Sequence, residues 1–436
     1  MTGFARQRIH TKEFKEMSDT MFFVVVTIVL GFNLGWYLLS DWWLRKELHS
    51  YPKARRYSRI ALVIWMFIVF VPIVSQLVGL GNPLEYGPWI WTSVLYLWMG
   101  AILFWMLGLA IIGIPTWGFL RYYDRKNRKQ VTHSEQMQAT EVLESTAQDN
   151  ILSRRQVLKL GLVAAPPLLV GSTAIATVFA KDRLNVRYID LPVRNLPHDL
   201  EGYTITHLSD THVGIVTGRE RIENIVNTAN QLKSNMTVVT GDILDNNFEY
   251  MPDLVDTIGQ LKADHGVHLC IGNHDKIHNA NEWITTVRNA GMDLLLDESI
   301  VIDTGGTPIK LLGIDYSRQE ADDYRNIRKA DEHVNTPENG LKILLAHHPH
   351  AFDPASEADI PITLAGHTHG GQIAIRIGEE YELFNAGNYL FRYVDGIYRK
   401  EQGNSLYVHR GSGDWFPLRA GVPTEVVQIR LVREET

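Results

Sequence analysis

Hydrophobic and polar positions divide the chain into two parts. Up to residue 180, the apolar positions form long runs without charge, at 21–40, 60–80, 88–120 and 160–180. A membrane-spanning helix needs about 20 such residues. The pattern therefore predicts an all-α region of about four transmembrane helices, the third covering about 90–114. The alternative is a set of buried helices in a soluble protein, which seldom stay uncharged over such a length.

The Lys and Arg residues predict which side each loop faces. The loop 41–59 holds six of them, the loop 81–87 holds none, and residues 121–129 hold five. Because basic loops stay in the cytoplasm, the loop 41–59 and the residues after 120 are expected there. The N-terminus is expected outside, although residues 1–20 also carry four basic residues. On this interpretation, residues 1–129 are a three-helix membrane region.

A polar stretch at 130–152 predicts a cytoplasmic linker, and residues 153–181 then lead out of the cytoplasm. This last segment opens with "SRRQVLK", which is close to a twin-arginine export signal, with Val157 where Phe is usual. Equally, Arg154 and Arg155 are ordinary positive-inside residues beside a fourth helix. Ala180 could end a cleavage site, but an uncleaved anchor is favoured. Each alternative predicts that the rest of the chain lies on the extracytoplasmic side of the cell membrane.

Residues 184–436 show a different pattern, in which short apolar runs alternate with helical periodicity. The runs "YTITHLSD", "MTVVTGD" and "GVHLCIGNHD" are separated by "RERIENIVNTANQLK" and "MPDLVDTIGQLKAD". Strands that alternate with helices predict an α/β domain. Ligands of such domains bind at the carboxyl ends of the strands.

Polar residues gather at those strand ends. Five consecutive apolar runs end in Asp, Asn or His: Asp210-Thr211-His212, Gly241-Asp242, Gly272-Asn273-His274-Asp275, His347-His348 and Gly366-His367-Thr368-His369. Any one of these could be a turn former or a solvated loop residue. Together they form a mixed carboxylate, amide and imidazole set, which suits paired Mn, Fe or Zn ions with open positions for substrate.

Charge and cysteine content narrow the classes of function. Residues 1–180 carry 18 Lys and Arg against 11 Asp and Glu, whereas residues 181–436 carry 24 against 38. An acidic domain of this kind argues against nucleic-acid binding, which requires a basic face. The single cysteine, Cys270, excludes an internal disulfide framework and a thiolate metal site.

The five motifs resemble those of the calcineurin-like metallophosphoesterases in order and type: D-x-H at 210–212, GD at 241–242, GNHD at 272–275, His347, and GHTH at 366–369. The stretches "LPHDLEGYTITHLSDTHVG" and "YVHRGSGDWFPLR" are similar to the membrane-anchored branch of that family. The resemblance implies two facing mixed β-sheets flanked by helices over residues 184–436.

The resemblance also implies a role for each residue. Asp210, His212 and His369 would hold one divalent metal ion, Asn273, His347 and His367 a second, and Asp242 both. A metal-bound hydroxide would attack phosphorus in line, His274 would protonate the leaving oxygen or steady the transition state, and Asp275 would orient His274. Asp245 is expected to shape its turn, and Arg410 and Arg419 could reach a substrate phosphate.

These residues predict a membrane-anchored phosphoesterase that hydrolyses a phosphodiester, phosphomonoester or pyrophosphate bond. A membrane location favours a lipid or lipid-linked substrate, and Trp415 and Phe416 could contact lipid. No residues specific to a substrate are predicted. Two alternatives stay open, a phosphodiesterase for soluble nucleotides and a non-catalytic membrane receptor or scaffold that keeps the fold.

Overall fold

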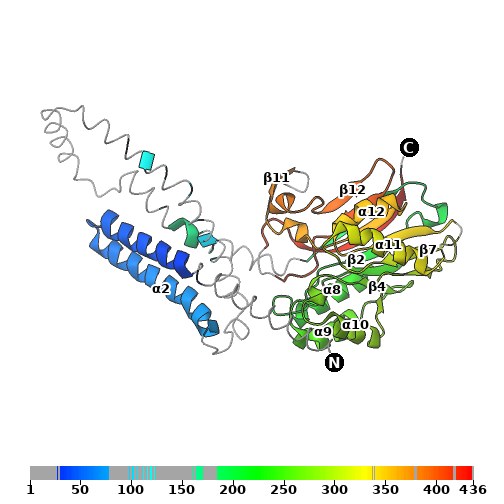
Figure 1. The fold of residues 1–436 in the computed structure, drawn as a ribbon, viewed down its shortest axis with the longest axis horizontal. Coiled ribbons are helices and arrows are strands. Elements are labelled where there is room, and N and C mark those ends of the chain that lie inside the picture. The colour runs from blue at the N-terminus through cyan, green and yellow to red at the C-terminus, as the bar shows by residue number, and fades with distance from the viewer. Residues whose placement is uncertain are drawn as a thin grey trace, which may run out of the picture. The chain divides into compact units, whose positions relative to one another are not determined.

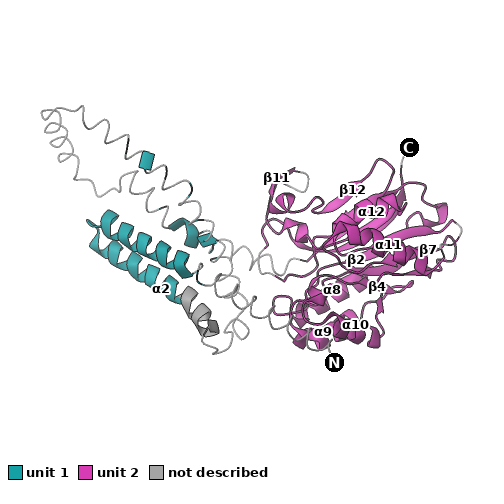
Figure 2. Ribbon diagram, in the orientation of Figure 1, with its two compact units in different colours: residues 1–174 teal, residues 175–436 magenta. Residues whose placement is uncertain are grey.

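The protein is described by a computed structural model. The described residues are Thr27, 30–77, scattered positions between 98 and 170, and 184–434. Within the last range, residues 336, 338, 378–380 and 416–418 are not described. The chain divides into two compact units, residues 1–174 and residues 175–436 (Figure 2).

In the first unit, helical residues 30–47 and helix α2 (Pro52–Leu77) share an apolar cluster. The indole nitrogen of Trp98 donates a hydrogen bond of 2.6 Å to Asn33 Oδ1 inside this cluster. The carboxylate of Asp41 lies between two guanidinium groups, 2.6 Å from Arg45 and 2.5 Å from Arg59. Asp41 near the end of the first helix is therefore paired with Arg45 of the same helix and with Arg59 of α2.

The expected region of four transmembrane helices is wrong for the part of the chain that is described. None of the described helices combines the length and the apolar character needed to cross a bilayer. The helix at residues 30–47 carries Asp41 and Arg45. The first eight residues of α2 include four basic ones, and its side chains are described only as far as Phe67. Most of the runs 88–120 and 160–180, the linker 130–152 and the Arg154–Arg155 pair lie outside the described residues.

The second unit contains two six-stranded mixed sheets (Figure 1). The first has the order β1 (Leu184–Val193), β14 (Thr424–Arg433), β2 (Thr204–Leu208), β3 (Met236–Thr240), β4 (Val267–Cys270) and β5 (Asp293–Leu294). The second has the order β12 (Gly396–Arg399), β13 (Ser405–Val408), β9 (Ile362–Ala365), β8 (Leu341–Leu345), β7 (Ile309–Gly313) and β6 (Glu298–Ile302). A separate hairpin is formed by β10 (Ala374–Ile377) and β11 (Tyr381–Asn385).

Four neighbouring strands of each sheet are parallel, and antiparallel pairs join the remaining strands to them. β2, β3, β4 and β5 pair in parallel, as do β13, β9, β8 and β7. Antiparallel pairs join β14 to β2, β6 to β7 and β12 to β13. The carboxyl ends of the central strands in each sheet therefore lie at one edge of that sheet.

Helices cover the outer face of each sheet and begin at local signals in the sequence. Gly218 precedes α8 (Arg219–Gln231), and α9 (Met251–Ile258) has a proline in its first turn. The Asn279 side chain caps α10 (Ala280–Asn289) by accepting from Glu282 N–H. These three helices belong to the first sheet, whereas α11 (Glu320–His333) and α12 (Phe352–Glu357) belong to the second.

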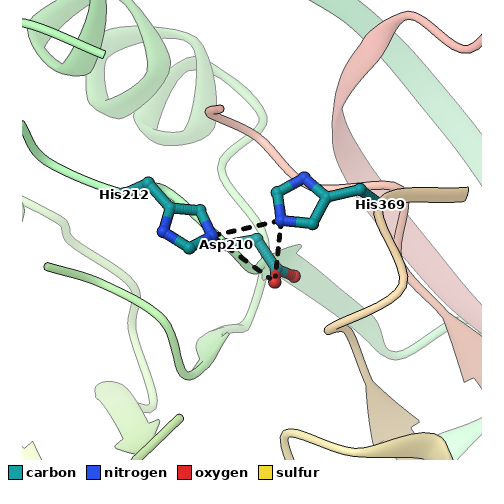
Figure 3. A group of neighbouring side chains, drawn as sticks. All are labelled: Asp210, His212 and His369. Atoms are coloured by element: carbon teal, nitrogen blue, oxygen red, sulfur yellow. Dashed lines mark hydrogen bonds and ion pairs between the residues drawn. The ribbon is translucent and has the colours of Figure 1, made fainter. Parts of the chain in front are cut away.

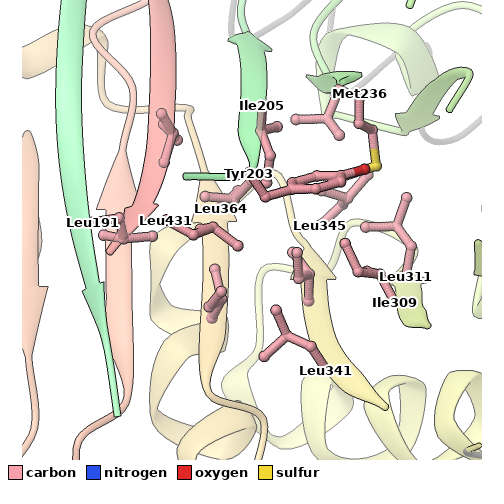
Figure 4. Packing of buried hydrophobic residues seen from close by; sticks show 14 of the residues in the cluster. Leu191, Tyr203, Ile205, Met236, Ile309, Leu311, Leu341, Leu345, Leu364 and Leu431 are labelled. Carbon is pink, nitrogen blue, oxygen red and sulfur yellow. The ribbon is translucent and has the colours of Figure 1, made fainter. Parts of the chain in front are cut away.

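The alternation of side chains along the strands builds three core layers. On β3, Val238 faces the layer between the two sheets and Val239 faces the layer under α8–α10. On β8, Ile343 belongs to the layer between the sheets, as does Leu345 (Figure 4), while Leu344 packs under α11 and α12. Strands buried on both faces need continuous apolar sequence, which explains runs such as "LKILLA". The predicted fold of two facing mixed sheets flanked by helices is confirmed for this unit.

Candidate metal centre

The loops after the central strands carry the candidate ligands, and their backbone is unusual. Asp210, His212, Asp242, His367 and His369 all have positive φ angles, between 44° and 73°. Non-glycine residues rarely adopt this conformation, and where they do it often marks a functional site. The strand ends are thus bent so that side chains of successive residues converge.

Glycines allow the close approach of these loops. A Cβ atom added to Gly272 would lie 2.1 Å from Asp242 Oδ1, and one added to Gly366 would lie 1.9 Å from Ser209 Oγ. Real Cβ atoms do not approach other atoms so closely. The glycines of GNHD and GHTH therefore make room for the neighbouring ligand loops.

The first group consists of Asp210, His212 and His369 (Figure 3). His212 Nε2 lies 3.1 Å from His369 Nε2. Asp210 Oδ1 lies 3.4 Å from His369 Nε2 and 3.9 Å from His212 Nε2. All three side chains are buried, so their polar atoms face one another and not solvent.

The second group consists of Asp242, His347 and His367, with Asn273 beside them. His347 Nε2 lies 3.2 Å from Asp242 Oδ2, 3.1 Å from Asn273 Oδ1 and 3.1 Å from His367 Nδ1. Asp242 Oδ2 also lies 3.7 Å from His212 Nε2 of the first group. The carboxylate of Asp242 therefore lies between the two groups.

These spacings fit two metal ions. Ligand atoms about 2.0–2.2 Å from one cation lie about 3.0–3.5 Å from each other in octahedral or tetrahedral geometry. Most of the separations within each group fall at or close to this range. Two imidazole nitrogens and a carboxylate oxygen that converge in a buried site form a donor set suited to Mn, Fe or Zn.

Burial and the carboxylate of Asp242 shift the pKa values of the candidate ligands. Burial opposes ionisation of Asp242, but His347 and His212 outweigh it and hold the pKa of Asp242 well below its usual value. Burial likewise lowers the pKa of His347, yet the Asp242 charge prevails and raises it to about 9. For His369 and His367, burial dominates and lowers the pKa to about 4 and about 3. These two rings are therefore neutral at pH 7 and can act as ligands.

His274 lies at the rim of the two groups, and its partner is Asp245. His274 Nδ1 lies 3.2 Å from Asp245 Oδ1, and its ring stands edge-on to His212 at a centroid distance of 4.6 Å. Burial lowers the pKa of His274, but the hydrogen bond to Asp245 and nearby carboxylates raise it overall. Asp245 Oδ1 is also 3.9 Å from His212 Nδ1. Asp245 thus faces the rings of His274 and His212. The sequence predicted only that Asp245 would shape its turn.

Asp275 faces the backbone instead of His274. Its Oδ1 accepts hydrogen bonds of 2.9 Å from Ile243 N–H and Leu244 N–H, and its Oδ2 accepts one of 2.9 Å from Gly272 N–H. Burial and the Asp242 charge raise its pKa to about 7. The geometry therefore gives Asp275 a part in fixing the loops after β3 and β4, and leaves Asp245 as the side chain that can orient His274.

Replacing Asp275 with Ala should destabilise the second unit. Three buried N–H groups would lose their acceptor, and each loss costs about 1–3 kcal/mol. We expect a loss of about 3 kcal/mol or more, measured as a lower urea midpoint for the transition of this unit. Asp264→Ala, at an exposed position, is the matched control and should change stability by less than about 0.5 kcal/mol. Equal midpoints for the two variants would contradict this role of Asp275.

Arg410 and Arg419, the two candidate phosphate contacts, are held by protein groups. Arg410 Nε donates to Asp395 at 2.6 Å. Arg419 is buried, pairs with Asp414, and brings Nη2 to 3.0 Å from His369 Nδ1. Arg419 thus supports the His369 ring from the side opposite to the ligand group.

An aromatic rim surrounds the two groups. Tyr316 lies 5.9 Å from His347, Phe391 lies 5.6 Å from His367 and Trp415 lies 5.5 Å from His274, measured between ring centroids. The contacts of Tyr316 and Phe391 were not foreseen, because neither residue stands in one of the motifs. Phe416 lies outside the described residues.

His348 is the remaining histidine of the predicted motifs. It stacks against His350 and His367 at centroid distances of 3.7 Å and 4.5 Å, and burial lowers its pKa to about 2. Among the described residues it joins none of the groups that could hold a metal ion. The choice of His347 over His348 as the candidate ligand agrees with this geometry.

Comparisons with known proteins place this site in a family. The model of the calcineurin-like phosphoesterase family matches residues 203–371. A transmembrane protein with metallophosphoesterase domain from Danio rerio is 29% identical over 254 residues, 56% of this chain and 56% of the relative. Its counterpart from Bos taurus is 29% identical over 292 residues, 62% and 63% of the two chains. An uncharacterized metallophosphoesterase from Helicobacter pylori is 29% identical over 238 residues, 52% and 58% of the two chains.

The matches with these relatives span 56% to 63% of their own length. Among solved structures, TT1561 of Thermus thermophilus is 12% identical, with a TM-score of 0.33, over 49% of this chain and 90% of that one. The resemblance inferred from the five motifs is thus confirmed: residues 203–371 match the calcineurin-like phosphoesterase family, and the chain is similar to transmembrane proteins with a metallophosphoesterase domain.

Proposed function

We propose that the chain is a metal-dependent phosphoesterase that holds two divalent cations. The observation that carries this proposal is the arrangement of two neighbouring ligand groups with the carboxylate of Asp242 between them. Asp210, His212 and His369 would hold the first cation, and Asn273, His347 and His367 the second. The donor types suit Mn, Fe or Zn, and we propose no single one of them. When bound, the two cations would polarise a phosphoryl group and activate water for in-line attack.

The residues around the cations have separate tasks in this proposal. His274, which is partly exposed, is placed to donate a proton to the leaving oxygen, and the hydrogen bond to Asp245 together with nearby carboxylates raises its pKa, which favours the protonated ring. Asp245 holds the His274 ring through Nδ1, so that Nε2 is left to act on the substrate. Asp242 Oδ1 accepts from His274 N–H at 2.8 Å, which ties the position of this residue to the ligand groups.

We further propose that the substrate is a lipid or a lipid-linked phosphate ester and that the catalytic unit works at a membrane surface. The aromatic rim of Tyr316, Phe391 and Trp415 offers apolar contacts next to the phosphate position. Two relatives carry the name transmembrane protein with metallophosphoesterase domain, which supports a membrane association. The bond hydrolysed would be a diester, a monoester or a pyrophosphate.

The full chain, stripped of metal with a chelator and then reloaded, tests the activity. We expect no hydrolysis of bis-p-nitrophenyl phosphate without metal, and hydrolysis restored by Mn²⁺ or Zn²⁺ at about two equivalents per chain. Lipid extracts from cells with and without the gene would identify the substrate as a phosphorylated lipid that accumulates in its absence. An inactive chain that binds two metal ions would support the non-catalytic alternative instead.

A further inference from the structure

A patch of large apolar side chains lies on the β10–β11 hairpin and on the turn η7 (Ala386–Tyr389) with the residue after it. Seven of them are between 36% and 81% exposed: Ile373, Ile375, Tyr381, Leu383, Phe384, Tyr389 and Leu390. We refer to these seven residues as the apolar wing. Figure 1 shows β11 at the periphery of its unit. A contiguous exposed apolar patch marks an interaction site more often than scattered apolar residues do.

Pairing and ring contacts link the hairpin part of the wing to its turn. Ile375 is paired with Phe384 across the hairpin, and the Phe384 ring lies 6.1 Å from that of Tyr389. The hairpin and η7 are joined by Asn385, whose Oδ1 accepts from Gly387 N–H at 2.8 Å. The seven side chains therefore belong to one compact piece of structure.

One end of the wing follows a turn that carries a candidate metal ligand, and the other end leads to an aromatic ring beside a second candidate ligand. The turn η6 (His369–Gly371) leads into the hairpin, and a Cβ atom on Gly371 would lie 1.9 Å from Asn385 Oδ1, so the junction is tight. At the other end, Leu390 is followed by Phe391, whose ring is 5.6 Å from His367. A molecule with its phosphorus between the two ligand groups could therefore extend along Phe391 to the wing.

The described charges of the hairpin are neutralised within the protein. Glu382 accepts from Arg376 at 2.7 Å, from Asn385 at 2.9 Å and from Asn388 at 3.1 Å. Arg376 also pairs with Asp395 at 2.8 Å. Arg376 and Glu382 therefore already have partners within the protein, and insertion into an apolar medium would not leave these two charges unpaired.

We propose that the apolar wing inserts into the boundary between the headgroups and acyl chains of a lipid bilayer, so that a lipid phosphate can reach the metal centre. Tyr389 and Leu390 are the most exposed of the seven, at 81% and 77%. Side chains that project from a turn in this way can enter a fluid layer, whereas a folded partner would need a matching groove. Aromatic and aliphatic residues together are typical of this boundary. The catalytic consequence rests on the proposed phosphoesterase function, but membrane insertion does not.

The single cysteine makes a direct test possible. Cys270 is fully buried, so Leu390→Cys in the full chain would provide one accessible thiol for a polarity-sensitive fluorophore. With phosphatidylcholine vesicles we expect a blue shift of emission, and quenching by lipids brominated on their acyl chains. Asn289→Cys, at an exposed position on α10, is the matched control and should show neither.

Three results would overturn the proposal. The first is no spectral change at Leu390→Cys with vesicles, and the second is an equal change at Asn289→Cys. The third is a shift that grows with protein concentration in the absence of lipid, which would identify a second copy of the chain as the partner.

An activity assay connects the wing to catalysis. Removing both of its most exposed side chains in Tyr389→Ser/Leu390→Ser should lower hydrolysis of a vesicle-borne phospholipid by about tenfold or more, while hydrolysis of bis-p-nitrophenyl phosphate stays unchanged. If the wild-type chain hydrolyses neither ester, the phosphoesterase proposal fails and the quenching result still decides the fate of the wing. An equal loss on both esters would show that the wing does not act through lipid.

Discussion

Asp242→Asn should remove both metal ions and reduce phosphoester hydrolysis by about a thousandfold or more, because the loss of both cations removes several kcal/mol of transition-state stabilisation. The carboxylate of Asp242 lies between the two ligand groups, 3.2 Å from His347 Nε2 and 3.7 Å from His212 Nε2. Asn preserves the shape of the side chain and its acceptor for His274 N–H. The variant therefore tests the loss of charge and not a collapse of the loop.

Metal content and turnover should be measured on the same preparation. Elemental analysis of the Asp242→Asn chain is expected to show less than half an equivalent of metal in total. His367→Ala, which removes a ligand from one group alone, is expected to keep about one equivalent. Normal turnover by Asp242→Asn, or an equal metal content in the two variants, would mean that Asp242 does not bridge two sites.

The central strands of the catalytic unit could be predicted from the sequence because they are buried on both faces. β2, β3, β4, β8 and β9 coincide with apolar runs that leave little alternative to a parallel strand. The last strand, β14, carries no such local information about its position. It lies between β1 and β2, parallel to one and antiparallel to the other, and this arrangement depends on contacts between distant parts of the chain.

Residue types at strand ends indicated the candidate ligands, but they did not indicate the orientation of single side chains. Asp245 and Asp275 are both acidic residues close to the motif that contains His274. The turn η4 (His274–Lys276) directs Asp275 inward to three backbone N–H groups, and the loop after β3 brings Asp245 to His274 instead. Such differences depend on backbone angles, including the positive φ of five ligand residues, and residue types do not specify these angles.

The prediction of transmembrane helices was based on uncharged length alone. In the described residues of the first unit, Asp41 is 8% exposed and pairs with Arg45 and Arg59. The uncharged run 21–40 did not indicate that its helix would continue into the paired residues Asp41 and Arg45. A helix must be apolar along its whole membrane-crossing length, so the ends of the helices matter as much as the runs themselves.

His274→Gln should reduce the turnover of an alkyl phosphodiester by about a hundredfold to ten-thousandfold with both metal ions retained, because a positioned proton donor contributes about that much. His274 faces Asp245 and the rim residue Trp415, and it belongs to neither of the two proposed ligand sets. Elemental analysis should therefore give the wild-type metal content. A variant that loses metal together with activity would show that His274 is a ligand and not a proton donor.

The leaving group distinguishes proton donation from simple stabilisation of charge. A p-nitrophenolate ion departs without a proton, whereas an alkoxide requires one. If His274 donates that proton, His274→Gln should impair an alkyl phosphodiester far more than a p-nitrophenyl ester. Asp245→Asn should show the same pattern to a smaller extent, since the His274 ring would stay in place but lose a carboxylate that raises its pKa. An equal loss on both esters would mean that the protonated ring acts by its charge alone, and Asp245 would then matter by holding that charge near the phosphoryl group.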